Sequence, residues 1–407
     1  MILEKKVIFI FGIAKFDGQF ESTSFTTAKF LARYNKVYYI DYPYTVKDYF
    51  LNRHTSEFNK RRKAFFNSSL CLLDTDIENL KILILPPVLS INFLPENWIY
   101  RWLLRRSENL IIRRLKQIMN RMKINELVFI NSFNFHYPDV SIALRPILSV
   151  YHCVDPLVID HDRRHGIVSE HMIVKNADLI ICTSLQLYRE KKADNINSFF
   201  IPNAADLEHS VKAMDPSLEV HPLVGEIAGP RVGYFGNIER RMDFDLLTKL
   251  ALLNPAVNFV FAGPVSEQYI PDGFRQMDNV HFIGRIPYDL MPSVIKGFDV
   301  AIIPFKKDEV SATIFPLKLF EYLGAGKPVI ATDFNPDLKE FTKDTVYYCS
   351  SAQEFTVAIA DSITQNNDQA KKARLLVASE NTWEKRLTEF STLIAEFYQY
   401  ASSNKTI

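Results

Sequence analysis

The sequence predicts an α/β protein with two doubly wound parallel sheets. Short apolar runs alternate with segments of helical period, and the alternation pauses once before it starts again. Runs of Val, Ile, Leu and Phe without polar alternation are typical of strands buried on both faces of a parallel sheet. The length of 407 residues also exceeds what one hydrophobic core usually organises. We therefore expect two domains of similar size.

The elements can be assigned in chain order. Strand candidates of the first series are VIFIFGI, KVYYIDY, LKILILP, ELVFINS, LSVYHCVD, DLIICTS and NSFFIPN, with a helix over FTTAKFLARY. The second series has RVGYFGN, NFVFAGP, NVHFIG, DVAIIPF, KPVIAT and TVYYCS, with a helix over DFDLLTKLALL. Residues 204–230 have no clear period and contain Pro, Gly and mixed charge, which is typical of a connection.

We therefore assign an N-terminal domain to residues 1–203, an interdomain connection to 204–230 and a C-terminal domain to 231–383. The last helix, about 384–407, is long and amphipathic, so it suits packing on either domain, including back onto the first. Ligands of parallel sheets bind beyond the carboxyl ends of the strands, and with two such domains we expect the site in a cleft between them.

Composition narrows the class of protein. The chain is 47% hydrophobic with a net charge of +1, which excludes a disordered chain or a strongly basic nucleic-acid-binding protein as the first interpretation. No window approaches the ~20 uncharged apolar residues of a membrane span, and VIFIFGI at the start is typical of a strand rather than of a signal peptide. The four cysteines are widely spaced and are expected to be buried free thiols. We expect a cytoplasmic protein.

The segment FPLKLFEYLGAGKPVIAT, residues 315–332, has the features of an anion and diol site. Pro316 suits the first turn of a helix, and the free N–H groups of a helix start attract anions. Lys318 lies where a cation opposes the helix dipole, which makes sense if phosphate is bound there. Glu321 shares its face, and a carboxylate accepts two hydrogen bonds from a vicinal diol such as ribose. The alternative is an exposed ion pair between Lys318 and Glu321 on a surface helix.

These segments together resemble the retaining GT-B glycosyltransferases of the group 1 family, which build bacterial surface polysaccharides. PLKLFEYLGAGKPVIAT resembles the C-terminal signature of that family, and IPNAAD, RVGYFGNIERRMD, NFVFAGP and NVHFIGRIPYDLMPSVIKGFDVAIIPF resemble further segments in order. SVYHCVDP and NADLIICTS resemble the end of its acceptor domain. The resemblance implies a GT-B fold, with two Rossmann-like domains facing each other across a cleft. The N-terminal domain would bind the acceptor and the C-terminal domain the nucleotide-sugar donor.

The resemblance also implies roles for individual residues of the C-terminal domain. Glu321 would hold the ribose of the donor and Lys318 its pyrophosphate. Gly236 and Asn237 would line the diphosphate, because glycine lets the backbone approach a ligand closely. Arg241 would neutralise the leaving phosphate, and the neighbouring Arg240 is the alternative for that role.

One departure from the family concerns the donor sugar. Many relatives have a first glutamate upstream of the second, whereas Thr313 occupies that region here, eight positions before Glu321. Contact with the sugar is therefore expected from Thr313, from its neighbours or from backbone amides. Pro316, at the start of the helix, is expected among the residues that bind the donor nucleotide.

Candidates in the N-terminal domain follow its strands. Asp155 comes directly after the strand in VYHCVDP and is our preferred catalytic candidate, whereas His152 lies within the strand. For His152 we expect an imidazole that faces the core and bonds to the backbone, with an acceptor-side role as the alternative. Gly18 is a candidate for an acceptor-side loop.

No metal or cofactor is expected. His161, His165 and His171 lie in so polar a segment that a solvated loop and helix explains them better than a metal site. In GT-B enzymes the resemblance implies protein cations and a helix dipole in place of a metal. No Gly-x-Gly-x-x-Gly follows the first strand, which argues against a dinucleotide oxidoreductase.

The segment 101–123 contains eight basic residues and one acidic residue. Basic amphipathic helices lie on anionic membranes, so peripheral contact with the inner face of a membrane is one interpretation. A solvated helix face on a globular domain is the other.

The sequence therefore predicts a metal-independent glycosyltransferase of the hexosyltransferase type. It would move a sugar from a UDP- or GDP-linked donor to a hydroxyl of a glycan or lipid-linked glycan, with retention, in bacterial surface polysaccharide synthesis. Two alternatives stay open. One is a nucleotide-sugar epimerase of GT-B fold, and the other is a non-catalytic nucleotide-binding subunit of a polysaccharide assembly complex.

Overall fold

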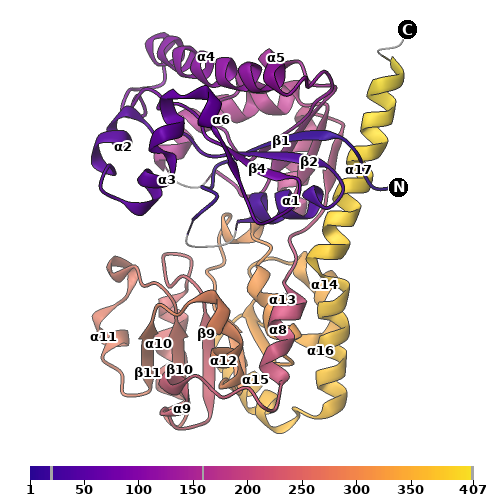
Figure 1. Cartoon of the computed structure of the whole chain (residues 1–407). Helices are drawn as coiled ribbons and strands as arrows, with labels where there is room; N and C mark the ends of the chain where they lie inside the picture. The colour runs from indigo at the N-terminus through magenta and orange to yellow at the C-terminus, as the bar shows by residue number, and fades with distance from the viewer. Residues whose placement is uncertain (19–21, 158–159, 405–407) are drawn as a thin grey trace. The chain divides into compact units, whose positions relative to one another are not determined.

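The computed structural model describes residues 1–18, 22–157 and 160–404. It divides into two compact units (Figure 1). Unit 1 comprises Met1–Pro202 and Leu387–Ile407, and unit 2 comprises Asn203–Arg386. Each unit is an α/β layer structure around its own sheet, as the alternation of apolar runs predicts.

Unit 1 is built on an eight-stranded sheet of order β3-β4-β2-β1-β5-β6-β7-β8. All neighbouring strands are parallel except β3 and β4. The strands are β1 (Val7–Gly12), β2 (Lys36–Ile40), β3 (Leu72–Asp74), β4 (Leu80–Leu83), β5 (Val128–Ser132), β6 (Leu148–Cys153), β7 (Leu179–Cys182) and β8 (Ser198–Phe200). The central strand β1 pairs Ile10 with Tyr39 of β2 and Ile130 of β5, and it is buried from Ile8 onward because helices cover both faces.

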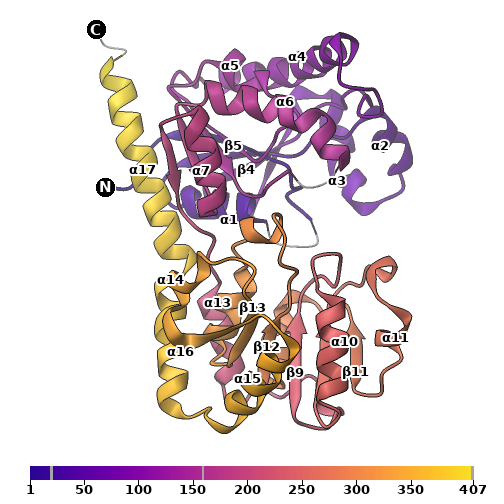
Figure 2. The same ribbon diagram turned by 180° about the vertical axis from the view of Figure 1, so that it is seen from behind.

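The helices of unit 1 connect these strands. They are α1 (Thr23–Ala32), α2 (Val46–Leu51), α3 (Ser56–Phe66), η1 (Ser68–Leu70), α4 (Trp98–Arg121), α5 (Asp139–Leu144), α6 (Asp160–Asn176) and α7 (Leu185–Asp194). Figures 1 and 2 show α1 on one side of the sheet and α4 beside α5 on the other. The polar segment expected as a solvated loop and helix is the helix α6.

Unit 2 is built on a six-stranded parallel sheet of order β11-β10-β9-β12-β13-β14. The strands are β9 (Arg231–Phe235), β10 (Asn258–Ala262), β11 (Val280–Gly284), β12 (Val300–Ile303), β13 (Val329–Thr332) and β14 (Val346–Cys349). The strand order reverses between β9 and β12, so the residues that follow these two strands lie at a topological switch point.

The helices of unit 2 connect its strands, and among these helices α10 packs against α15 and α13 packs against α8 and α16. They are α8 (Leu207–Val211), η2 (Lys212–Met214), α9 (Pro222–Gly225), α10 (Phe244–Leu253), η3 (Glu267–Tyr269), α11 (Asp272–Arg275), η4 (Tyr288–Leu290), α12 (Met291–Lys296), η5 (Ser311–Thr313), α13 (Leu317–Gly324), α14 (Leu338–Thr342), η6 (Lys343–Thr345), α15 (Ala352–Thr364) and α16 (Asp368–Glu380).

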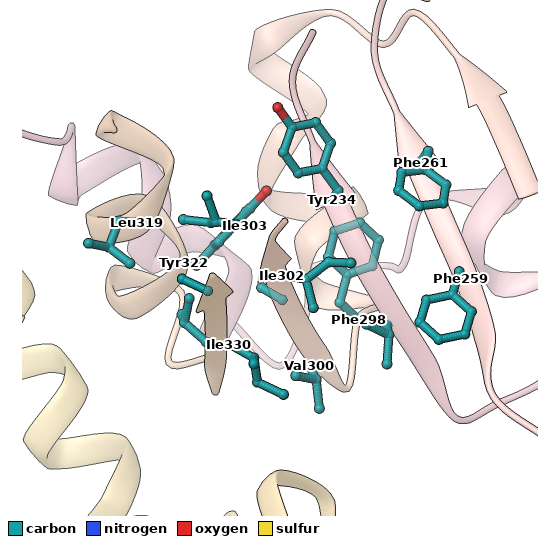
Figure 3. Packing of buried hydrophobic residues seen from close by; sticks show 14 of the residues in the cluster. Tyr234, Phe259, Phe261, Phe298, Val300, Ile302, Ile303, Leu319, Tyr322 and Ile330 are labelled. Atoms are coloured by element: carbon teal, nitrogen blue, oxygen red, sulfur yellow. The ribbon is translucent and has the colours of Figure 1, made fainter. Parts of the chain in front are cut away.

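The core of unit 2 extends from its strands to α13. Figure 3 shows Tyr322 and Leu319 on α13 beside Ile303 and Ile330, with Tyr234 and Phe298 further along the sheet. The Tyr322 hydroxyl accepts a hydrogen bond from the backbone N–H of Phe235 at 2.7 Å. This bond fixes the helix against the end of β9.

The structure differs from the sequence assignment at residues 204–230. This segment is not a separate connection, because it belongs to unit 2, where α8 packs against α12 and α13 and η2 packs against α12. Its helices have five residues or fewer, too short for a helical period to be recognised. The last helix, α17 (Trp383–Asn404), begins in unit 2 and belongs to unit 1 from Leu387.

Two expectations about composition are confirmed. All four cysteines are free and buried. Within the described ranges, no helix combines the length and apolar character needed to cross a bilayer.

Candidate nucleotide site

The start of α13 lies beside the switch point of the unit 2 sheet and has no side-chain cap. Pro316 is the N-cap residue, one position before the first turn in which the sequence placed it, and the structure gives it no capping bond. Thr313, three positions before Pro316, does not cap this helix, because it is buried in η5 and its hydroxyl donates to the carbonyl of Val310 at 2.6 Å. The first N–H groups of α13 are therefore not satisfied by a cap, as an anion site requires.

Glu321 is a buried carboxylate on α13. Only 9% of the residue is exposed, and its Oε1 accepts a hydrogen bond from the Tyr288 hydroxyl at 2.8 Å. Burial raises the pKa of Glu321, although the Tyr288 hydroxyl and the nearby Lys318 ammonium oppose that shift. The alternative of an exposed surface ion pair is wrong, because Glu321 is buried and Lys318 bonds elsewhere.

Lys318 points toward the end of β9. Its Nζ donates to the hydroxyl of Tyr234 at 2.9 Å and lies 4.7 Å from the centre of that ring. The same ammonium lies 5.3 Å from the ring of Phe305, which also has the Arg241 guanidinium at 5.9 Å. The Lys318 and Arg241 side chains therefore both lie near the Phe305 ring, although 77 positions separate the two residues in the sequence (318 − 241).

Gly236 brings the backbone after β9 against the Lys318 side chain. Its φ of +147° is in the region that favours glycine, and a Cβ there would lie 2.7 Å from the Lys318 Nζ. Gly263, after β10, has a φ of +145°, and a Cβ on it would lie 2.0 Å from the carbonyl oxygen of Gly236. Two glycines are thus needed to let these loops approach each other and the ammonium group.

The other predicted residues of unit 2 surround this point. Arg241 forms an ion pair with Glu239, and its carbonyl accepts a hydrogen bond from the Lys306 N–H at 2.8 Å. Asn237 is exposed and contributes its carbonyl, which accepts a hydrogen bond from the Tyr234 hydroxyl at 3.0 Å. Arg240 is half-buried beside Arg241. The predicted residues of unit 2 thus lie around the start of α13. The roles of Arg240 and Arg241 stay predictions.

The sequence prediction missed the aromatic residues of the site, which are Tyr234 and Phe305 beside Lys318 and also Tyr288 and His209. Tyr288, which bonds Glu321, is stacked on His209 with ring centres 4.5 Å apart. His209 is buried on α8, and neither ring nitrogen has a hydrogen-bond partner among the described residues. His209 lies in residues 204–230, which we had assigned to an interdomain connection. Nothing in that assignment pointed to His209 as a residue of the site.

Three predicted residues belong to unit 1. His152 is buried with its Nδ1 3.3 Å from the Ser132 hydroxyl and its ring 5.0 Å from that of Phe390, so it bonds a side chain rather than the expected backbone. Burial lowers its pKa to about 4, which keeps the ring neutral. Asp155 follows β6 and is exposed, and Gly18 donates its N–H to the carbonyl of Lys15 at 3.1 Å.

The histidines of α6 do not form a metal site with their neighbours. His165 is buried, in contrast to the solvated position we expected, because its ring stacks on Tyr100 at 3.6 Å and its Nδ1 lies 2.8 Å from a Glu96 carboxylate oxygen. Throughout residues 1–18, 22–157 and 160–404, no group of three or more His, Cys, Asp or Glu could hold a metal ion.

Part of the sequence resembles that of known proteins. Residues 229–389 match the family described as "Glycosyl transferases group 1". A relative from Bacillus subtilis, described as a teichuronic acid biosynthesis glycosyltransferase (TuaH), is 28% identical over 259 residues, which are 58% of this chain and 63% of the relative. The match therefore spans less than two thirds of that protein.

Two solved structures share the fold of almost the whole chain. Sucrose-phosphate synthase from Thermosynechococcus elongatus has a TM-score of 0.66 at 15% identity, covering 98% of this chain and 100% of that one. Anabaena HepE, solved in complex with UDP, has a TM-score of 0.59 at 14% identity, covering 99% and 100%. The predicted GT-B fold is confirmed.

Proposed function

We propose that this chain transfers a sugar from a nucleoside-diphosphate sugar to a glycan hydroxyl. The match of residues 229–389 to the family described as "Glycosyl transferases group 1" and the GT-B fold support this proposal. The observation that carries the proposal is the cluster at the start of α13. There a buried carboxylate, an ammonium group and a glycine-lined backbone lie at the switch point of a parallel sheet.

Each part of the cluster suits one part of the donor. Glu321 accepts the two ribose hydroxyls, and its burial strengthens these hydrogen bonds by excluding water. Lys318 and the uncapped N–H groups of α13 bind the diphosphate, with Arg241 beside them. As the bond to the sugar breaks, negative charge grows on the leaving phosphate, and these fixed cations and dipoles stabilise it.

The proposal extends to the donor nucleotide, the stereochemistry and the metal requirement of the reaction. UDP is the first donor nucleotide to test, since it was solved bound to the structurally similar HepE; GDP is the alternative. We propose retention of configuration and no metal requirement, because the cluster supplies its own cations. Asp155 is the proposed catalytic residue from unit 1. The name of the Bacillus relative supports a role in the synthesis of a surface polysaccharide.

We also propose that the acceptor is a glycan or lipid-linked glycan, reached at a membrane surface. The exposed face of α4 supports this, because Trp98 and Trp102 lie on it with Arg105, Arg106 and Arg113. The Arg106 guanidinium lies 4.8 Å from the Trp102 ring. Exposed tryptophan beside arginine is typical of helices that lie at the membrane interface.

The decisive experiment is calorimetric titration with UDP, GDP and ADP. We expect one nucleotide to bind wild type and Glu321→Ala to weaken it about 10- to 100-fold, since hydrogen bonds to a charged group contribute roughly 1.5–3 kcal/mol. Glu340→Ala, which removes an exposed glutamate of α14, is the matched control and should bind like wild type. Equal loss in both variants, or no binding by wild type, would refute the nucleotide site.

Measuring turnover of the donor distinguishes a transferase from an epimerase and from a non-catalytic subunit. A transferase releases nucleoside diphosphate from the donor faster when acceptor is added, whereas an epimerase converts the donor without acceptor. Nucleotide binding with no turnover of any donor would favour a non-catalytic subunit.

A further inference from the structure

A cavity of about 410 Å³ opens in unit 1 where three strands begin. Its lining includes Val7 at the start of β1, Lys36 at the start of β2 and Val128 at the start of β5. Because these strands are parallel, the cavity lies at the opposite edge of the sheet from the strand ends that precede Gly18 and Asp155. It is therefore not part of the site expected beyond the carboxyl ends of the strands.

Four lysines line this cavity: Lys5, Lys6, Lys36 and Lys123. The one acidic residue in its lining, Glu126, already accepts a hydrogen bond from the Tyr398 hydroxyl at 2.7 Å. Lys6 lies over the Tyr398 ring at 4.3 Å. In the part of the chain that the structure describes, no ion pair holds Lys5, Lys36 or Lys123. The cavity thus has four cations and one carboxylate, and an anion would relieve their repulsion.

Two of these lysines occupy backbone positions that favour glycine. Lys5 has a φ of +55° and Lys123 a φ of +53°. Lys123 directly follows Met122, the C-cap of α4, where a left-handed glycine is the usual residue. A side chain other than that of glycine is strained in this conformation. The sequence therefore places cations at this cavity in spite of a backbone cost, which points to a ligand.

The volume of the cavity and its other lining residues indicate which kind of anion fits. A volume of about 410 Å³ lies at the small end of the range of roughly 300–1,000 Å³ for ligand sites. Asn125 and Tyr38 add an amide and a hydroxyl that suit sugar hydroxyl groups.

We propose that this cavity binds an anionic sugar, one that carries a phosphate or a carboxylate. The anion lies among Lys5, Lys36 and Lys123, and the sugar hydroxyls face Asn125 and Tyr38. A sugar phosphate and a uronic acid unit of a glycan share this chemistry. The site is independent of the proposed donor site, whose residues all belong to unit 2.

The test is titration of the whole chain with glucose 6-phosphate, glucuronate, glucose and inorganic phosphate, followed by NMR or calorimetry. We expect glucose 6-phosphate or glucuronate to bind saturably and more tightly than glucose or inorganic phosphate. Whichever of the two binds more tightly identifies the source of the anion. The variant Lys5→Gln/Lys36→Gln/Lys123→Gln should weaken this binding about tenfold or more.

The control variant Lys175→Gln/Lys249→Gln/Lys372→Gln has the same net charge and changes exposed lysines outside the cavity. It should bind the anionic sugar like wild type. Equal weakening in both variants, or no preference for the anionic sugars over glucose, would overturn the proposal. UDP titration of the same proteins reports separately on unit 2, where binding should be unchanged, so failure of one site does not imply failure of the other.

Discussion

Tyr288 occupies a hydrogen-bonding position at Glu321 that a ribose hydroxyl would need. Its hydroxyl donates to Glu321 Oε1 at 2.8 Å, and its ring is held against His209. Without a bound ligand, this bond gives the buried carboxylate a hydrogen-bond partner. An unpaired buried carboxylate would destabilise the fold because it has lost its contact with water. If Glu321 binds the ribose, the nucleotide must displace this hydroxyl or share the carboxylate with it.

Tyr288→Phe therefore should tighten nucleotide binding. The variant keeps the aromatic ring on His209 but removes the competing hydroxyl, and a net hydrogen bond of roughly 0.5–1.5 kcal/mol corresponds to a gain of about 2- to 12-fold. Calorimetry with UDP measures the change. Tyr269→Phe, an exposed tyrosine of η3, is the control and should leave the affinity unchanged. Weaker binding by Tyr288→Phe would instead show that the hydroxyl contacts the nucleotide.

At the scale of elements, α4 carries a buried acid that caps a second helix. Glu108 is 2% exposed, and its Oε1 accepts a hydrogen bond from the N–H of Asp139, the first residue of α5. Since Pro138, the N-cap of α5, gives no side-chain cap, Glu108 takes over that role from another helix. Burial raises the pKa of Glu108 to about 8.

This pKa predicts that stability falls as the pH rises toward about 8. The folded state holds the proton more tightly than the unfolded state, so the contribution of Glu108 is present in acid. It is lost between the ordinary pKa of glutamic acid and about 8, at roughly 1.4 kcal/mol per pH unit. Glu108→Gln keeps the acceptor oxygen without titrating. Urea unfolding of both proteins between about pH 6 and pH 8 should show wild type losing stability relative to the variant.

The control for this measurement is Glu78→Gln, which changes an exposed glutamate of the same unit. It should follow the wild-type pH dependence. Parallel curves for wild type and Glu108→Gln would contradict a raised pKa at Glu108.

At the scale of the whole molecule, membrane contact would bring the chain to a lipid-linked acceptor. The exposed face of α4 carries Arg105, Arg106 and Arg113, whereas the one acidic residue of this helix, Glu108, is buried. No carboxylate of α4 therefore offsets the charge of these arginines at the surface. Near an anionic bilayer each basic residue contributes roughly 1 kcal/mol, and salt screens the attraction.

The chain should therefore sediment with vesicles that contain phosphatidylglycerol and not with vesicles of phosphatidylcholine alone. Replacing Arg105, Arg106 and Arg113 by glutamine should weaken the association about tenfold or more. The variant Lys249→Gln/Lys372→Gln/Lys385→Gln, which changes exposed lysines elsewhere, should sediment like wild type. Sedimentation that is equal for all three proteins would reject α4 as the contact.

Part of the candidate nucleotide site was predictable because Lys318 and Glu321 lie in one short segment. Lys318 and Glu321 are three positions apart on a helix, so their shared face follows from helical geometry. Gly236 could be found because it ends an apolar run before a turn. The arginines could be located but not ranked, since their partners, Glu239 and Phe305, depend on how the loops fold.

The sequence by itself determined the two sheets, their strands other than β3, and the helix α13 of the candidate nucleotide site, because burial imposes a local period on apolar residues. Only the tertiary structure decided which distant side chains meet. Tyr288 bonds Glu321 across 33 positions. Tyr234 bonds Lys318 across 84 positions, because the strand order places β9, which carries Tyr234, next to β12, which precedes α13. It also brought Lys5, Lys36 and Lys123 into one cavity, since parallel strands that are distant in sequence begin at the same edge of the sheet.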